Sequence, residues 1–271
     1  MVAILLCLRR VRRLVLLASL GLGLAFVACT DVPADDDAAA GAIDDKGDRG
    51  GAAGFTEVNP RRSSAAFRTY VERAIRELEQ DDSQIARLTA ASIRAGRVQI
   101  DELVDLTCWD FERVRADVPD LHLTSADYAR LTPGSALARA LAGEIDGYMW
   151  SNRVYVSRGQ TTRNLAATLV HETNHVINRS EVGYWDDLPT SAFRHEYRAF
   201  YAEAMFDPDA YDGVDLTAHV IELYDLDRAA LPAAVLAAPL SPRLLPDAAA
   251  WRARNVAADP RDVDATCPGR R

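Results

Sequence analysis

The sequence predicts a mainly helical α+β domain with one small antiparallel sheet. Three observations carry this prediction. Apolar residues recur at helical spacing through most of residues 63–238. Two short apolar segments flank Ser151 and Asn152 and together predict a β-hairpin at about 145–157. The segments on either side of 63–238 are dominated by small residues, glycine, proline and aspartate, a composition that does not build a core.

Residues 1–28 are expected to be an export signal. The basic stretch "RRVRR" precedes an uncharged apolar run, 14–28, which ends in small residues. The run is shorter than the roughly 20 residues of a membrane span, and a single membrane anchor is the alternative. The junction "LAFVAC" resembles a bacterial lipobox, although Phe26 stands where leucine is usual. That resemblance implies cleavage before Cys29 and a lipid on Cys29 that anchors the protein in the bacterial cell envelope, on its periplasmic or outer surface.

The segments outside the domain suit an exported chain. Residues 29–62 are expected to be a disordered acidic tether, and residues 239–271 an extended tail. The formal net charge is −9, and losing the four arginines of the acid-free signal takes it to about −13. This charge argues against nucleic acid and anionic membrane surfaces as partners. In an oxidising compartment, the remaining Cys108 and Cys267 predict a disulfide, with two unpaired thiols as the alternative.

The domain is expected to begin with three helices, at 64–80, 81–96 and 99–114. Asp82 or Ser83 caps the second of them. The first helix carries an apolar stripe at helical spacing, formed by Phe67, Val71, Ile75 and Leu78.

The hairpin comes next, and in its second strand, "RVYVS", the two valines face one way and the residues between them face the other. A helix at 161–178 follows at once, with Thr161 or Thr162 as its N-cap. Further helices are expected at 190–206, 214–226 and 229–238.

The helix at 161–178 contains "HETNH", which has the residue types and the spacing of a zinc site. His171 and His175 are four residues apart and lie on one helical face, away from its apolar side. Both rings can therefore place a nitrogen about 2.0–2.1 Å from one Zn²⁺ ion. Glu172 is offset by one residue, so it can reach a water on the metal without displacing it. The alternative is a helix with two solvated histidines.

"HETNH", followed by a helix that carries glutamate, resembles the zincin peptidases and specifically their gluzincin branch. The resemblance covers about 145–206. It implies a third zinc ligand from an E-x-x-A pattern on the later helix, which is matched here by "EYRA" and so by Glu196. It also implies a substrate strand ahead of the motif helix, and "RVYVS" stands in that position.

The third ligand has rivals in the sequence. Glu203 is seven residues past Glu196 on nearly the same face, as either a ligand or a carboxylate bonded to a ligand histidine. Glu181 completes an H-E-x-x-H-x-x-N-x-x-E spacing like that of the metzincins, in which the third ligand is a histidine. Asp186 and Asp187 are further alternatives. His195 is expected at the surface or beside the ligands, with oxyanion stabilisation as another role. Tyr184, Tyr197 and Tyr201 are the candidate stabilisers of a tetrahedral intermediate.

The function expected from these residues is a zinc-dependent metallopeptidase that uses one Zn²⁺ ion. His171, His175 and Glu196 would hold the metal, and Glu172 would be the general base for a metal-activated water. The partner would be a peptide or protein substrate extended along "RVYVS". The alternative is a non-catalytic zinc-binding surface lipoprotein, which would need a fourth protein ligand to close the site. The sequence does not indicate the cleavage specificity or the oligomeric state.

Overall fold

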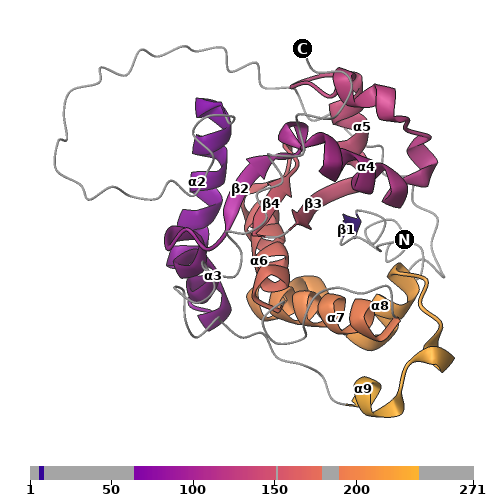
Figure 1. Cartoon of the computed structure of the whole chain (residues 1–271). Coiled ribbons are helices and arrows are strands. Elements are labelled where there is room, and N and C mark those ends of the chain that lie inside the picture. The colour runs from indigo at the N-terminus through magenta and orange to yellow at the C-terminus, as the bar shows by residue number, and fades with distance from the viewer. Residues whose placement is uncertain (1–5, 9–63, 151, 179–188, 238–271) are drawn as a thin grey trace, which may run out of the picture.

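The structure is a computed structural model, and it describes residues 6–8, 64–150, 152–178 and 189–237 (Figure 1). Helices predominate in this part of the chain, and a small sheet lies between two groups of them, so the predicted α+β class is confirmed. Among the described residues, no helix is long and apolar enough to cross a bilayer. The predicted tether and tail lie outside the described residues, as does all of the predicted signal except residues 6–8.

The sheet is mixed and has the strand order β1-β3-β4-β2. β3 (Ile145–Trp150) and β4 (Arg153–Val156) form the predicted antiparallel hairpin. β2 (Gln99–Glu102) runs parallel to β4, and the short β1 (Leu6–Leu8) runs antiparallel to β3. The prediction of a purely antiparallel sheet was therefore wrong, because β2 joins it from a distant part of the sequence.

The helix predicted at 99–114 was wrong in its first part, because residues 99–102 form β2. Its residues alternate between the two sides of the sheet: Ile100 packs in the apolar core, whereas Asp101 forms an ion pair with buried Arg153 at 3.2 Å. The 3₁₀ helix η1 (Leu103–Asp105) follows. The α-helical part is only α4 (Cys108–Asp117), which Thr107 caps by accepting a hydrogen bond from the Asp110 amide.

One face of the sheet is covered by α2 (Ala65–Gln80), α3 (Gln84–Arg94) and α6 (Thr162–Asn178) (Figure 1). Ser83, rather than Asp82, caps α3. The two valines of β4 belong to this core, as predicted. The predicted stripe of α2 is fully buried in it, through Phe67, Val71, Ile75 and Leu78.

α4 and α5 (Ala136–Glu144) pack on the opposite face, with two 3₁₀ helices, η2 (Pro119–Leu121) and η3 (Ser125–Arg130), between them. Cys108 begins α4 and is buried, whereas Cys267 lies outside the described residues. Its predicted pairing with Cys267 therefore stays a prediction.

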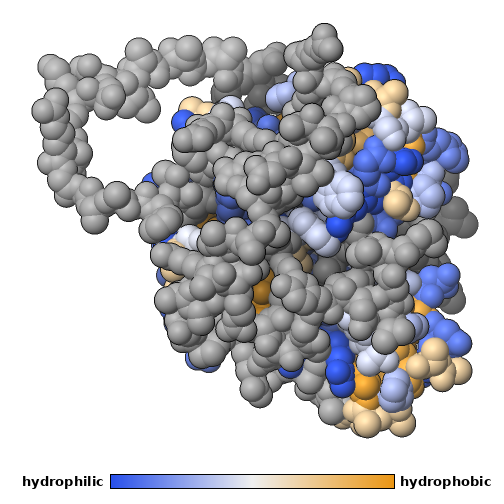
Figure 2. Space-filling view, viewed as in Figure 1, coloured by the Kyte–Doolittle hydropathy of each residue, from blue (hydrophilic) through white to orange (hydrophobic). Residues whose placement is uncertain are grey.

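α7 (Pro189–Phe206) packs along α6 and carries a separate apolar cluster with α8 (Leu216–Leu223) and α9 (Ala233–Ala237). Between them lie the 3₁₀ helices η4 (Pro208–Tyr211) and η5 (Arg228–Ala230). Much of this cluster is only partly buried. Figure 2 accordingly shows apolar surface toward the lower right, where Figure 1 places α8 and α9.

Candidate metal centre

The motif helix α6 is buried on all sides in its central part. Every residue from 165 to 177 is buried, including the polar ones. Thr161 starts the helix, as its hydroxyl accepts a hydrogen bond from the Asn164 amide at 3.1 Å. The apolar side of α6 faces α2 and α3, and the polar side faces β3 and α7. The predicted amphipathic pattern thus places the histidines at an internal contact rather than at the surface.

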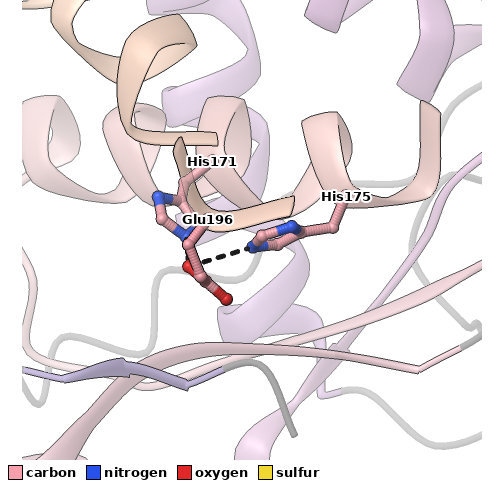
Figure 3. A group of neighbouring side chains, drawn as sticks. All are labelled: His171, His175 and Glu196. Carbon is pink, nitrogen blue, oxygen red and sulfur yellow. Dashed lines mark ion pairs between the residues drawn. The ribbon is translucent and has the colours of Figure 1, made fainter. Parts of the chain in front are cut away.

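Three side chains converge where α6 meets α7. His171 and His175 point from α6 toward Glu196 of α7 (Figure 3). Glu196 Oε2 lies 3.5 Å from His171 Nε2 and 3.8 Å from His175 Nε2. One ligand atom from each residue lies within 4.8 Å of the other two, so the group could hold a metal ion.

The polar atoms of this group that lack hydrogen-bond partners support a metal ion at this position. Among the described residues, His171 Nε2, His175 Nε2 and both Glu196 carboxylate oxygens are buried without a hydrogen-bond partner. Buried polar atoms are normally satisfied, because an unpaired one costs roughly 1–3 kcal/mol. Two imidazole nitrogens and one carboxylate are ordinary ligands of a transition metal. A metal bound between them would satisfy the unpaired atoms together.

Burial and neighbouring charges shift the protonation of these residues in the metal-free chain. Burial alone lowers the pKa of His171, but the carboxylates of Glu196 and Glu203 outweigh it and raise that pKa to about 10. Burial and the charge of His171 hold the pKa of His175 well below its ordinary value. Burial raises the pKa of Glu196. A proton on His171 therefore takes the place of a cation between the carboxylates.

Glu172 lies at the contact between α6 and β3. It is fully buried, and burial raises its pKa to about 8. A Cβ atom added to Gly147 of β3 would lie 2.7 Å from Glu172 Oε1 and 2.6 Å from Thr168 Cγ2. Only glycine lets the strand approach the helix this closely. The strand that passes Glu172 is therefore β3, and β4 is paired on both sides within the sheet. The strand "RVYVS" has no free edge in this structure, because β2 and β3 pair with it, and β3 is itself paired with β1 and β4. The expectation that a substrate pairs with "RVYVS" stays a prediction.

A second group of residues orients the ligands. Glu203 Oε2 lies 3.1 Å from His171 Nδ1, which keeps the proton on that nitrogen and turns Nε2 toward the group. The Phe200 ring forms a T-shaped contact with the same imidazole, with 4.6 Å between ring centroids. The hydroxyl of Tyr224 lies near the Glu196 carboxylate and lowers the pKa of Glu196. The geometry of this contact does not satisfy either carboxylate oxygen of Glu196.

Some of the other candidates lie in the described part of the chain, and the rest lie within residues 179–188, which the structure does not describe. Of the two roles left open for Glu203, its position beside the outer nitrogen of His171 matches a carboxylate bonded to a ligand histidine. His195 is fully buried, with its ring centroid 6.3 Å from that of His175, so a surface position is wrong. Tyr197 and Tyr201 stack on each other, with 6.4 Å between ring centroids. The remaining candidates lie outside the described residues: the rival ligands Glu181, Asp186 and Asp187, and Tyr184.

Two residues of the site were missed from the sequence. Tyr224 lies near the C-terminal end of α8, 28 positions after Glu196, and no motif connects the two. Gly147 lies within the predicted hairpin. An isolated glycine within a strand pattern is a known sign of close backbone approach, so the sequence does contain this signal.

Comparisons of the chain with models of protein families, with curated proteins and with solved structures give no match. The resemblance to zincins therefore rests on the residues of 145–206 and stays a prediction.

Proposed function

We propose that the protein is a zinc-dependent metallopeptidase. The observation that carries this proposal is the buried group of His171, His175 and Glu196, whose ligand atoms face one another, together with Glu172 on the same helix. A helix with two solvated histidines does not bury both rings completely against a third ligand.

The ligand set favours zinc and a catalytic site. Within the described residues, the group of possible ligands has three members, whereas a structural zinc site is closed by four. Two histidines and one glutamate are a ligand set of known zinc peptidases. When bound, zinc lowers the pKa of a coordinated water and polarises a carbonyl group.

Glu172 would be the general base and then the general acid. Its carboxylate would accept the proton of the attacking water and deliver it to the leaving amine. Its buried position against Gly147 fixes the carboxylate beside β3. His171 and His175 would bind through Nε2, with Glu203 holding the proton on Nδ1 of His171.

The substrate would be a peptide or protein segment in an extended conformation. An extended segment can pair with the edge of a sheet through backbone hydrogen bonds. We assign this role to the edge of β3 away from β4, beside Gly147 and Glu172, where the short β1 pairs in the structure. The export signal and the lipid on Cys29 would place the reaction in the bacterial cell envelope.

The test compares the wild type with Glu172→Gln, which removes the base and keeps the size of the side chain. Zinc content is measured after purification without chelators, and hydrolysis is measured with a fluorogenic peptide library. We expect both proteins to bind one zinc ion and only the wild type to cleave peptides. Glu222→Gln, the same change at an exposed position of α8, is the control and should cleave as the wild type does.

Peptide cleavage by Glu172→Gln at the wild-type rate would overturn the assigned mechanism. A wild-type protein without bound zinc would reject both the enzyme and a non-catalytic zinc-binding protein.

A further inference from the structure

Two aromatic rings flank Glu196 on α7, one on each side. An α-helix turns about 100° per residue, so His195 and Tyr197 project to opposite sides of Glu196. The Tyr197 ring packs against Phe193 in the apolar cluster that α7 shares with α8, with 5.5 Å between ring centroids. The His195 ring lies instead beside His175 of α6. Of the two, His195 is therefore the residue on the side of the ligand histidines of α6.

Tyr201, the second tyrosine of α7 that the sequence suggests as a stabiliser of a tetrahedral intermediate, follows Tyr197. It stacks on Tyr197 with 6.4 Å between ring centroids, one turn further along the same side of the helix. The apolar cluster that contains Tyr197 is built from residues between 193 and 236, which excludes α6. Both tyrosines of α7 thus belong to the side of this helix that packs on α8.

Distances distinguish His195 from a metal ligand. The ring centroids of the two ligand histidines, His171 and His175, are 4.8 Å apart, whereas the His195 centroid lies 6.3 Å from that of His175. The three residues whose ligand atoms lie within 4.8 Å of one another are His171, His175 and Glu196. His195 is therefore a neighbour of this group and lies farther from His175 than the other ligand ring does.

This longer separation suits a donor to the substrate. During hydrolysis the water oxygen bonds to the carbonyl carbon, the water proton passes to Glu172, and the π electrons of the carbonyl group move to its oxygen. A donor stabilises that negative charge from about 2.7–3.1 Å, whereas a ligand histidine approaches zinc to about 2.0–2.1 Å. Because the donor contacts an oxygen atom rather than the metal, its ring lies farther from the ligand rings.

The side chains on the other sides of the ligand group cannot fill this role. Glu203 lies 3.1 Å from His171 Nδ1, and Glu172 lies against β3. Both are carboxylates, and a carboxylate repels an oxyanion. The Phe200 ring, which packs on His171, carries no donor. An imidazole, in contrast, has an N–H donor in either tautomer, so His195 can supply the hydrogen bond.

We propose that His195 is a catalytic residue that donates a hydrogen bond to the oxyanion of the tetrahedral intermediate. The inference rests on the proposed function and adds the stabilising group to it. When the intermediate collapses, an electron pair of the oxyanion re-forms the carbonyl group, and the pair of the C–N bond leaves with the nitrogen. The proton held by Glu172 then passes to the leaving amine. His195 keeps its own proton throughout, and a neutral imidazole can act as such a donor.

The test uses the full zinc-loaded chain with three substitutions of His195. His195→Leu and His195→Ala both remove the donor, the first with a similar side-chain volume, and His195→Gln restores an N–H donor. The matched controls are His122→Leu and His122→Gln, the same changes at an exposed histidine. Zinc content and the hydrolysis of the library peptide that the wild type cleaves fastest are measured for each. Calorimetry then measures the binding of a phosphinic analogue of that peptide.

We expect His195→Leu to keep one zinc ion and the wild-type KM and to lose about 100-fold in kcat. A lost oxyanion donor costs about 10²–10³-fold in kcat, and an interaction made only in the transition state leaves KM unchanged. The phosphinic analogue has a tetrahedral anionic centre, so its affinity should fall at least about tenfold. His195→Gln should recover part of both losses, and the two His122 variants should match the wild type.

Three results would overturn the role of His195 while leaving the peptidase intact. The first is a wild-type kcat and analogue affinity in whichever of His195→Leu and His195→Ala folds and binds zinc. The second is loss of zinc in both, which marks a ligand or a structural residue. The third is the expected pair of losses in Tyr224→Phe instead, which would assign the donor to the hydroxyl near Glu196. Failure of the proposed function is distinct, because the wild type and the His122 variants would then lack zinc or hydrolysis.

Discussion

At the scale of single residues, the site depends on one orientation of the His171 ring. Glu203 binds its Nδ1 and the Phe200 ring packs at a steep angle against it, so Nε2 is left to point at Glu196 and His175. A metal ligand held in this way needs no reorganisation when the metal binds. The sequence alone predicts Glu203 as either a metal ligand or a carboxylate bonded to a ligand histidine.

Glu203→Ala should weaken zinc binding while leaving the three ligands in place. Loss of an outer partner of a metal-binding histidine typically costs about 10- to 100-fold in affinity, because the ring is no longer held in one orientation and tautomer. Glu203→Gln, which can still accept from Nδ1, should lose less. Competition with a chromophoric chelator measures the affinity, and Glu222→Ala is the control. Wild-type affinity in Glu203→Ala would show that the contact does not orient His171.

Zinc affinity should rise with pH from about 7 to 10. The pKa of His171 in the metal-free chain is about 10, so this ring is protonated at pH 7 and must lose a proton to bind metal. Each pH unit below that pKa then costs roughly tenfold in affinity. Calorimetry in buffers of different ionisation enthalpy should detect the released proton at pH 7. Affinity independent of pH over this range would contradict the protonated state of His171.

At the scale of elements, the close contact between β3 and α6 positions Glu172. The sequence predicted both elements, because the 3.6-residue period of α6 and the alternation in the hairpin are local signals. The same signals predicted α2 and α3. These local signals failed for β2, because this short strand is followed directly by helical turns. Only its pairing with β4 identifies it as a strand. The local pattern of apolar residues does not reveal which strand pairs with which.

Gly147→Ala should reduce both stability and activity. The new methyl group would lie 2.6–2.8 Å from Thr168 and Glu172, so the helix or the strand must move. Overpacking of this kind costs about 1–3 kcal/mol in the free energy of unfolding. Urea unfolding and peptide hydrolysis measure the two effects. Gly143→Ala in α5, where nothing lies within 4 Å of the added methyl, should instead be neutral or stabilising by roughly 0.5–1 kcal/mol. Equal effects at both positions would contradict the close contact.

At the scale of the whole molecule, the candidate site joins parts of the chain that the sequence connects only weakly. His171 and His175 could be paired from their spacing alone, and Glu196 was favoured through the resemblance of its helix. Glu172 lies against β3, whereas the resemblance implied β4 as the strand beside the substrate. Strand order is a global property, because it depends on β2 and β1, which lie far from the motif in sequence.

Zinc should stabilise the whole fold, because its ligands come from α6 and α7, and α6 also packs on the sheet. A ligand present at 100 times its Kd adds about 2.7 kcal/mol to the free energy of unfolding. For a domain of this size, that raises Tm by roughly 5–10 °C. Calorimetric scans with zinc and with a chelator measure the shift. Glu196→Gln should lose most of it and Glu222→Gln should keep it. The same Tm with zinc and with chelator in the wild type would mean that no metal links the two helices.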